Sequence, residues 1–429
     1  MKTLALVFLF FLNAITGLLP AAGDTGAAPE EKLYLVRNQG KCGFIDRTGR
    51  VVIPLAYDAA SAFSEGLAPV KVGKLWGAID RTGRMVISPQ PYQIMGFLNG
   101  MSIVRDLEGP DRLIGFMDKA GNLPISPRFQ SACSFYKNRA WVGTAQGGGF
   151  IDKSGEAIIP MQYQVYNVDF FMHGDYCLLK DRQGIPRFVH ISGIVLNTPD
   201  IDLAKPYFQE LAAVRSNGLW GYLNQTGQWA ILPQYQEAEL FSEGFAWVLT
   251  EGRWGTVDRK GKVVIPPSFK ASRLFHEGLS WVWDGKGWGC VDPSGELRIP
   301  FRFSEVEDFS GGRAWVKQSG RWGVVDPRGK WLISPRFHGH QSFQEGYALV
   351  NIGGIEPSVC DAISVEEGIG GRWGLIDTKG RWVIPPRYST VEFFDGEVGL
   401  FKKNGCWKYV DRWGRILWTG DRGDNCPIF

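Results

Sequence analysis

The sequence contains few of the residues and patterns on which catalytic and metal centres are built. It has five histidines among 429 residues, and no two cysteines follow the C-x-x-C spacing of zinc and redox motifs. The motifs G-x-S-x-G and H-E-x-x-H and the glycine-rich phosphate loop are absent. We therefore expect a protein that is not an enzyme and that has no catalytic residues, metal ligands or cofactors.

Charge of a single sign is also missing. The chain carries 47 basic and 44 acidic residues, a formal net charge of +3, and they are scattered without long runs. A nucleic-acid-binding surface needs basic residues gathered on one face. No nucleic-acid partner is therefore predicted.

Long apolar runs are missing beyond the N-terminus. There Lys2 precedes a largely apolar stretch at residues 4–19, and residues 20–23 supply small side chains suited to cleavage before Asp24. This order predicts a signal peptide over residues 1–23 and export to the periplasm or the cell exterior, with no membrane span after cleavage. An uncleaved membrane anchor is the alternative, although the run is short for a spanning helix.

The seven cysteines give a weak structural signal. Export permits disulfides, but an odd number leaves at least one thiol unpaired or paired between chains. A Cys406–Cys426 bridge that fastens the C-terminal tail is one possibility, because spacing alone does not fix connectivity.

Glycine and tryptophan, in contrast, are abundant, with 55 and 17 residues. The pair Trp254-Gly255 opens a motif that continues through Asp258, Gly261 and Pro266. The glycines of this motif stand at positions 43, 77, 115, 149, 221, 255, 289, 323 and 374. The step from 43 to 77 recurs along most of the chain; the step from 149 to 221 hides one degenerate unit, and the last step contains a 17-residue insertion. With a final unit near residue 407, this period predicts about eleven repeats.

One unit can be interpreted in physical terms. Alternating and β-branched residues predict three short antiparallel strands at residues 245–249, 254–257 and 262–265, a meander. Asp258 and Gly261 occupy the first and fourth positions of a type I turn, where the aspartate side chain bonds a backbone N–H and glycine accepts a positive φ.

Two residues of the motif carry further structural predictions. Pro266 and Pro267 end the third strand, because proline cannot donate to a ladder. Glycine in mid-strand, as at Gly255, predicts the close approach of another group, for which a large aromatic of an adjacent strand or unit is the obvious candidate.

The repeats resemble the bacterial WG (KWG) repeat family, whose loose pattern is F-x-E-G-x-A-x-V, a spacer, and W-G-x-I-D-x-x-G-x-x-x-I-x-P. The matching residues of one unit are Phe241, Glu243, Gly244, Ala246, Val248, Trp254, Gly255, Val257, Asp258, Gly261, Ile265 and Pro266. The resemblance covers roughly residues 33–418, although Cys42, Ile114 and Gly148 replace the motif tryptophan in three units. It implies a repeat-type binding domain, often in exported or surface proteins, and carries no catalytic signature.

The predicted fold is all-β: a tandem array of about eleven three-stranded antiparallel meanders. No unit is split between the two ends of the chain, which favours an open β-repeat superhelix over the alternative of propeller-like rings. The predicted order is a signal peptide (1–23), a short linker (24–32), N-terminal repeats (33–163), an irregular, degenerate repeat (164–207), further repeats (208–350), an insertion loop (351–372) and C-terminal repeats with a tail (373–429).

A tryptophan ladder is the first candidate binding site. Trp247, Trp281 and Trp315 stand one repeat length apart, on the strand face opposite the small and branched residues, and Trp141 occupies the same position in an earlier unit. If that face is exposed, the rings form a platform for sugars or apolar peptide groups, with Trp283 nearby. If units pack through it, the rings are core.

The insertion between Gly353 and Gly371 is the second candidate. Repeat insertions map to loops, and such loops often carry function. This one contains four acidic residues, which are Glu356, Asp361, Glu366 and Glu367. A solvated loop without a specific role is the alternative.

Three functions are consistent with the sequence. The favoured one is an exported, non-catalytic scaffold that binds another protein. The second is a carbohydrate- or cell-wall-binding protein that uses the tryptophan ladder. The third is a hydrolase or lyase on a β-repeat scaffold, because glycosidase carboxylates can lie far apart in sequence.

Overall fold

The computed structural model describes residues 31–165, 175–354 and 371–422, and every regular element in them is a β-strand. The all-β prediction is therefore confirmed. Within these described ranges, no helix is long and apolar enough to cross a membrane. The predicted signal peptide (1–23) and Cys426 lie outside the described residues, so export and the disulfide to Cys406 stay predictions.

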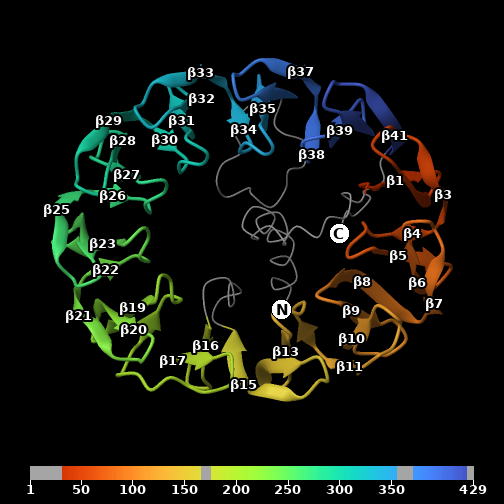
Figure 1. The fold of residues 1–429 in the computed structure, drawn as a ribbon, viewed down its shortest axis with the longest axis horizontal. Helices are drawn as coiled ribbons and strands as arrows, with labels where there is room; N and C mark the ends of the chain where they lie inside the picture. Colours follow the sequence, from red (N-terminus) through yellow and green to blue (C-terminus); the bar gives the residue numbers. More distant parts are fainter. Residues whose placement is uncertain (1–30, 166–174, 355–370, 423–429) are drawn as a thin grey trace. The chain divides into compact units, whose positions relative to one another are not determined.

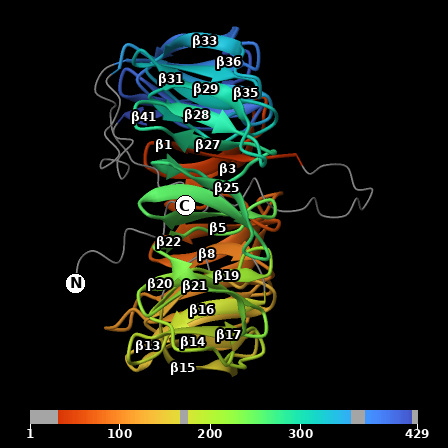
Figure 2. The same ribbon diagram turned by 90° about the vertical axis from the view of Figure 1, so that its left-hand side faces the viewer.

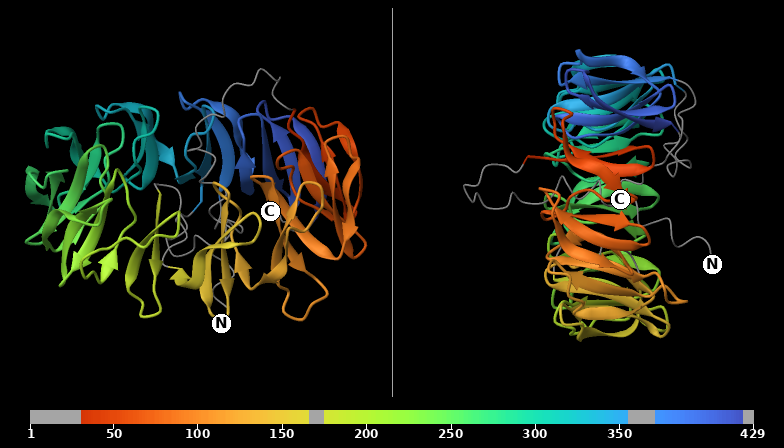
Figure 3. Two further views of the ribbon diagram at one scale, coloured as in Figure 1. Left: turned by 60° about the horizontal axis from the view of Figure 1, so that its bottom comes forward. Right: turned by 90° about the vertical axis from the view of Figure 1, so that its right-hand side faces the viewer.

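The chain divides into two compact units. The first unit comprises residues 1–128, 405–411 and 416–429. Its strands are β1 (Tyr34–Asn38), β2 (Lys41–Ile45), β3 (Val51–Tyr57), β4 (Ala59–Ala60), β5 (Leu67–Val72), β6 (Leu75–Asp80), β7 (Met85–Gln90), β8 (Tyr92–Leu98), β9 (Met101–Asp106), β10 (Ile114–Asp118), β11 (Ile125–Phe129), β40 (Cys406–Asp411) and β41 (Ile416–Arg422). Figure 3 draws β1 to β11 in red to yellow-orange.

The second unit comprises residues 129–404 and 412–415. Its strands are β12 (Ser131–Ala132), β13 (Arg139–Thr144), β14 (Gly147–Asp152), β15 (Ala157–Val165), β16 (Tyr176–Lys180), β17 (Pro186–His190), β18 (Leu203–Ala204), β19 (Leu211–Ser216), β20 (Leu219–Asn224), β21 (Trp229–Tyr235), β22 (Glu237–Ala238), β23 (Phe245–Thr250), β24 (Arg253–Asp258), β25 (Val263–Phe269), β26 (Ala271–Ser272), β27 (Ser280–Trp283), β28 (Trp288–Val291), β29 (Leu297–Phe303), β30 (Glu305–Val306), β31 (Ala314–Gln318), β32 (Arg321–Val325), β33 (Trp331–Phe337), β34 (Gly339–His340), β35 (Tyr347–Ile352), β36 (Arg372–Asp377), β37 (Trp382–Tyr388), β38 (Thr390–Phe394) and β39 (Val398–Lys403). Figure 2 shows the sheets of this unit following one another from β13–β17 to β33.

The typical sheet has four strands where the sequence predicted three. In the sheet of β22 to β25, the two-residue strand β22 pairs with β23, which pairs with β24 and then β25 (Figure 1). The extra strand lies in the connection between two units, where the sequence predicted no strand, because two residues give no measurable alternation. The third predicted strand is also longer: β25 continues through Pro266 and Pro267. It is an edge strand, where proline is tolerated.

The predicted Asp-x-x-Gly turn is present. The Asp258 carboxylate accepts hydrogen bonds from the N–H groups of Lys260 and Lys262, each at 2.9 Å, and Gly261 has a φ of 79°. In this geometry the side chain satisfies backbone donors that the strands leave open.

The glycine of the Trp-Gly pair lies where β24 meets the edge strand at a β-bulge. A Cβ atom on Gly255 would lie 2.6 Å from the carbonyl oxygen of Ile265. Eight further motif glycines have an equivalent isoleucine carbonyl at 2.2–2.9 Å, namely Gly43, Gly77, Gly115, Gly149, Gly221, Gly289, Gly323 and Gly374. The close approach is confirmed, and in every one of these repeats the approaching group is backbone of the edge strand. At Gly289, Gly323 and Gly374 an aromatic ring of the same strand also lies 2.8 Å from the added Cβ atom, as predicted.

The degenerate repeat shows what happens when this glycine is lost. Pro186 and Arg187 stand one repeat length before Trp220 and Gly221. An arginine side chain cannot occupy the space that the edge strand needs, so the chain beyond β17 makes one bridge, between Val189 and Val195, instead of a full strand. The hairpin β16–β17 is then added to β15, which gives a six-stranded sheet and, over the described ranges, ten sheets rather than the predicted eleven.

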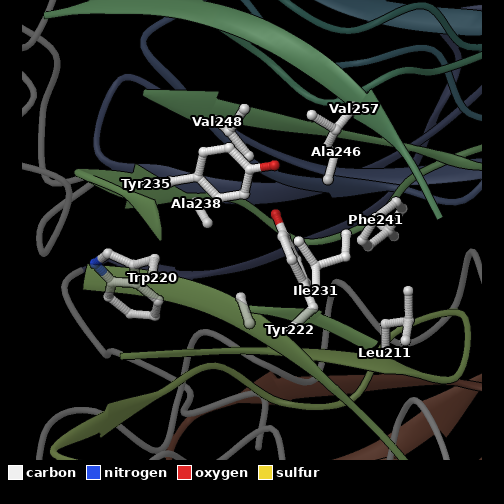
Figure 4. Close-up of a cluster of buried hydrophobic side chains, with 11 residues drawn as sticks. Leu211, Trp220, Tyr222, Ile231, Tyr235, Ala238, Phe241, Ala246, Val248 and Val257 are labelled. Atoms are coloured by element: carbon white, nitrogen blue, oxygen red, sulfur yellow. The ribbon is translucent and has the colours of Figure 1, made fainter. Parts of the chain in front are cut away.

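The core lies between successive sheets (Figure 4). In one cluster, Leu211, Trp220 and Tyr222 of the sheet β18–β21 pack against Ala246 and Val248 of the next sheet. The Tyr222 hydroxyl, 0% exposed, donates to the Glu239 carbonyl oxygen at 2.8 Å, so its polar end is satisfied. Sheets in this arrangement are covered on both faces.

The two ends of the repeat array meet within the first unit. Strand β41 lies beside β1 (Figure 1), and the buried Tyr409 hydroxyl donates to the Leu35 carbonyl oxygen at 2.6 Å. An open superhelix keeps its first and last repeats apart, so that expectation is wrong. Four-stranded antiparallel sheets with adjoining ends match the propeller-like alternative.

Candidate functional site

The tryptophan ladder is buried and is not a binding platform. Trp247 and Trp281 are each 1% exposed, Trp315 is 4% exposed and Trp141 is 5% exposed. Trp247 stacks on Phe275 of the next repeat, with ring centroids 5.8 Å apart and planes 6° apart. Of the two alternatives, an exposed binding platform is therefore excluded, because neighbouring sheets cover both faces of the strand.

The same packing recurs along the ladder. Trp281 stacks on Phe309 at 5.4 Å and Trp315 on Phe343 at 5.5 Å. The Trp281 indole N–H donates to the Glu307 carbonyl oxygen at 2.8 Å, whereas the buried Trp315 indole N–H has no hydrogen-bond partner among the described residues. These rings hold successive repeats together, which was the stated alternative.

Trp283 differs from the ladder. It is half-buried at the end of β27 and packs against Trp288 of the same sheet, with ring centroids 5.6 Å apart. A binding role for this ring stays a prediction.

The acidic residues of the insertion, which are Glu356, Asp361, Glu366 and Glu367, lie outside the described residues. The structure does describe the point where the insertion leaves the sheet. The Gly353 N–H donates to Nδ1 of His338 at 2.9 Å, and the Gly354 N–H donates to the Asn351 side-chain oxygen at 3.2 Å. The functional role predicted for the loop stays a prediction.

A row of charged residues, which sequence analysis missed, runs along four consecutive sheets of the second unit. Its members are Lys205, Glu239, Arg273 and Glu307, and they stand one repeat length apart. Each directly follows a two-residue strand and donates its N–H to a central strand, to the carbonyl oxygens of Ala213, Trp247, Trp281 and Trp315 respectively. The four side chains therefore start from equivalent backbone positions, with signs that alternate along the row.

The first half of the charged row is an ion pair between sheets. The Lys205 ammonium lies 2.9 Å from a Glu239 carboxylate oxygen and 3.5 Å from Glu237. The Lys205 ammonium also lies 5.3 Å from the centre of the Trp220 ring. A lysine with two carboxylates and an aromatic face is held in one place, which a surface lysine normally is not.

The second half is built on Arg273. Its guanidinium donates to both Asp308 oxygens, at 2.7 and 2.9 Å, and this hydrogen-bonded pairing raises the pKa of Arg273. Burial raises the pKa of Glu307, which accepts a hydrogen bond from the Ser342 hydroxyl at 3.2 Å.

A hollow of about 250 Å³ lies between these two halves. Its lining consists of Glu239, Ser272, Arg273, Leu274, His276 and Asp308. The His276 Nε2 atom lies 3.7 Å from an Asp308 oxygen. The hollow thus joins charged groups of both signs to the aliphatic side chain of Leu274, a composition that suits a peptide segment.

The signal for the charged row was present in the sequence, at a fixed offset of one repeat length. It was not recognised because charged residues are scattered through every repeat, and nothing in the sequence distinguishes one that follows a two-residue strand from one in a solvated turn. Among the residues that the structure describes, no three histidine, cysteine, aspartate or glutamate side chains come together as metal ligands.

Comparison with known proteins identifies the repeats. Nine segments match the family model described as "WG containing repeat", at residues 43–76, 76–107, 114–143, 149–176, 220–254, 254–282, 288–322, 322–354 and 373–407. The degenerate repeat between residues 177 and 219 is not among them. No curated protein matches the chain.

Several solved structures are distantly similar. One is a eukaryotic initiation factor, at 10% identity over 91% of this chain and 96% of that chain, with a TM-score of 0.42. Another is BamB from Moraxella catarrhalis, at 11% identity over 63% and 91%, with a TM-score of 0.27. A third is PorZ, a surface component of the type-IX secretion system of Porphyromonas gingivalis, at 10% identity over 90% and 69%, with a TM-score of 0.25. Likenesses at these TM-scores carry no argument about function.

Proposed function

This chain belongs to the WG-containing repeat family, and we propose that it is an exported, non-catalytic scaffold that binds another protein. The observation that supports the proposal is the charged row: Lys205, Glu239, Arg273 and Glu307 occupy equivalent positions in four consecutive sheets with alternating sign. A pattern of alternating charges fixes the register and orientation of a bound protein partner, and it contributes less to the affinity itself.

The charge of this surface indicates the chemistry of the partner. Two basic residues of the row stand with four acidic ones, counting Glu237 and Asp308, which leaves a net charge of −2 when His276 is neutral. A basic, extended segment complements it, with an aliphatic side chain placed over Leu274 in the hollow.

A charge-swap variant tests the proposal. Lys205→Glu combined with Glu239→Lys retains an ion pair between the two sheets but changes the order of signs along the row from + − + − to − + + −, so that the alternation is lost. We expect unchanged thermal unfolding and the loss of a partner that wild-type protein captures specifically from the cells that produce it. Glu296→Arg combined with Arg298→Glu is the matched control, because that pair, 3.0 Å apart, lies at strand β29 away from the row. Retention of the same partners by both variants would rule the charged row out.

Export is tested separately. We propose cleavage before Asp24, so the mature chain recovered from the producing cells should begin at this residue. N-terminal sequencing or intact mass measures this directly. A chain that keeps residues 1–23 and stays in the membrane fraction would support the uncleaved anchor instead.

A further inference from the structure

The degenerate repeat presents a second hollow, distinct from the charged row. It has a volume of about 370 Å³ and lies beside strands β15 to β17. Its lining consists of Gln162, Tyr163, Asp181, Arg182, Gln183, Arg187 and Val195. The hollow stands where Arg187 replaces the motif glycine and the edge strand is reduced to a single bridge.

Aliphatic side chains around this hollow are exposed. Ile194 is 68% exposed, Val195 45% and Ile185 38%. All three belong to the two turns of the degenerate repeat or follow them directly. These exposed apolar residues gather where the repeat departs from the pattern of the others and lacks a full edge strand. Such a combination indicates a docking surface.

The charge of the hollow is positive. The carboxylate of Asp181 is fully engaged, because Oδ1 accepts the N–H groups of Gln183 and Ile185 at 3.0 Å and Oδ2 accepts Nε of Arg187 at 2.9 Å. Within the described part of the chain, the Arg182 guanidinium forms no hydrogen bond or ion pair. One exposed cation is therefore available beside the aliphatic surface.

The sequence contains one segment with the opposite properties. Residues 354–371 include four acidic side chains, no basic ones and five isoleucines or valines. The two ends of this insertion leave the sheet β34–β37 at one point, since a Cβ atom on Gly371 would lie 2.5 Å from the Gly354 nitrogen. Charge and aliphatic content thus complement the hollow of the degenerate repeat.

We propose that this hollow binds the acidic insertion of a second copy of the chain. Four sheets intervene between β16–β17 and β34–β37, and a loop of this length anchored at one point reaches about 27 Å, because half of its residues must lead back. To reach the hollow of its own copy, the insertion would have to extend past the four intervening sheets. The insertion of a second copy can approach the hollow directly from outside.

Sedimentation velocity of the full chain tests this contact. We expect association that increases with protein concentration and weakens as salt is added. Arg182→Glu and Ile194→Ser should each weaken this association by about tenfold or more, the change in the equilibrium constant that roughly 1.4 kcal/mol produces. Arg328→Glu and Leu332→Ser are matched controls, an exposed turn arginine and an exposed aliphatic of strand β33, and should associate as wild type does. The proposal would be overturned if the wild-type chain stayed monomeric at protein concentrations up to about 100 times those used in binding assays. It would also be overturned if Arg182→Glu and Ile194→Ser associated as strongly as the control variants do.

A charge exchange identifies the two surfaces. Glu366→Lys combined with Glu367→Lys should abolish self-association, and a mixture of this variant with Arg182→Glu should restore it as a mixed assembly. A labelled peptide of residues 354–371, with Cys360→Ser to prevent oxidation, should bind the wild-type chain and not Arg182→Glu. The contrary outcome is that the peptide binds a chain lacking residues 355–370 but not the wild-type chain, while both chains are monomeric. In that case the insertion occupies the hollow of its own copy, and the contact between copies is refuted.

This proposal goes beyond the proposed function and can fail independently of it. The charge swap at Lys205 and Glu239 should leave self-association unchanged, because neither residue lines the hollow of the degenerate repeat. Conversely, Arg182→Glu should leave capture of a heterologous partner unchanged.

Discussion

In the repeats that carry the Trp-Gly pair, the tryptophan fills space beside the edge strand and the glycine leaves room for the backbone of that strand. Trp220 and Trp322 are buried, at 5% and 7% exposure, while Gly221 and Gly323 admit the carbonyl oxygen of the edge strand. A glycine in the middle of a strand loses more conformational entropy on folding than other residues do. The pairing of the edge strand, which the glycine makes possible, offsets this cost. The degenerate repeat, with Arg187 in place of the glycine, loses that strand.

Gly255→Ala should therefore destabilise the protein although the change adds one methyl group. The new Cβ atom would lie 2.6 Å from the Ile265 carbonyl oxygen, and backbone on both sides must shift. We expect a loss of about 2 kcal/mol or more in the free energy of unfolding, within the range of overpacked cores. Denaturant unfolding measures it. Gly339→Ala is the control, since its nearest neighbour lies at 3.7 Å; equal losses for the two variants would contradict the explanation.

His340 occupies a position where other repeats carry a small or aliphatic residue, such as Ala238 or Val306. Its ring stacks on Trp315, with centroids 4.1 Å apart, and its Nδ1 atom has no hydrogen-bond partner among the described residues. The facing charged group is Glu307, with an oxygen 3.8 Å from Nε2. Burial lowers the pKa of His340 to about 3, so the folded protein holds this ring neutral.

Acid should therefore destabilise the fold through His340. The unfolded chain binds a proton near pH 6.5 and the folded chain does not until about pH 3, so this contribution is complete above pH 6.5 and is lost as the pH falls. Between pH 7 and pH 5 the loss should be about 2 kcal/mol. His340→Val should remove it, as measured by urea unfolding at several pH values. His338, whose pKa is also lowered, remains in that variant and sets the residual slope. A wild-type slope that survives His340→Val unchanged would exclude His340 as its source.

The role of a single residue could be predicted from the sequence where its contacts lie within a few neighbouring residues of the chain. The turn of Asp258 and Gly261 could be predicted because its chemistry lies within a single short turn. The burial of Trp247 could not, because alternation distinguishes the two faces of a strand but does not say whether a second sheet covers the outer one. Its stacking partner, Phe275, lies in the next repeat.

Between elements, carboxylates of the F-x-E-G turns connect successive sheets. Glu277 accepts the N–H groups of Gly311 and Gly312, at 2.6 and 2.9 Å, and Glu243 accepts the N–H of Gly278 at 2.8 Å. Each bond reaches the corresponding turn of the next repeat, 34 or 35 residues onward. The glutamate of the family motif thus links neighbouring sheets, a role that its sequence position alone does not reveal.

Glu277→Ala should weaken the junction between two sheets. Two charge-assisted hydrogen bonds are lost at an exposed turn, for which we expect about 1 kcal/mol. Glu251→Ala is a close control, because both glutamates adopt a positive φ, 55° and 50°, so the backbone effect of alanine is shared. Equilibrium unfolding of both variants gives the difference. A loss no larger than that of the control would show that the carboxylate does not stabilise the junction.

The sequence predicted the positions of the longer strands better than the number of strands in each sheet. Strands with clear flanking turns were found near their expected places, as in β23 and β24. Two-residue strands such as β22 were missed, since so short a segment carries neither alternation nor propensity. The edge strand β25 was shortened because proline normally ends a strand.

At the scale of the whole chain, the repeat period was evident but the relation of its ends was not. The absence of a split repeat favoured an open array, because propellers often close by such a split. In the structure, the first and last repeats pack against each other in the first unit through side chains instead. Tyr34 and Tyr409 bring their rings to 5.8 Å, and the Tyr409 hydroxyl bonds the Leu35 carbonyl oxygen.

Tyr409→Phe should therefore loosen a strand that lies 374 residues away in sequence. The variant leaves a buried carbonyl oxygen unsatisfied, which costs about 1–2 kcal/mol. Amide hydrogen exchange should become faster in β1, because its protection depends on the contact with β41. Tyr347→Phe is the control: this tyrosine is half-buried against Phe394, at 5.6 Å, in the second unit. If exchange in β1 is unchanged in Tyr409→Phe, the hydrogen bond from Tyr409 to Leu35 does not stabilise the contact between the two ends of the array.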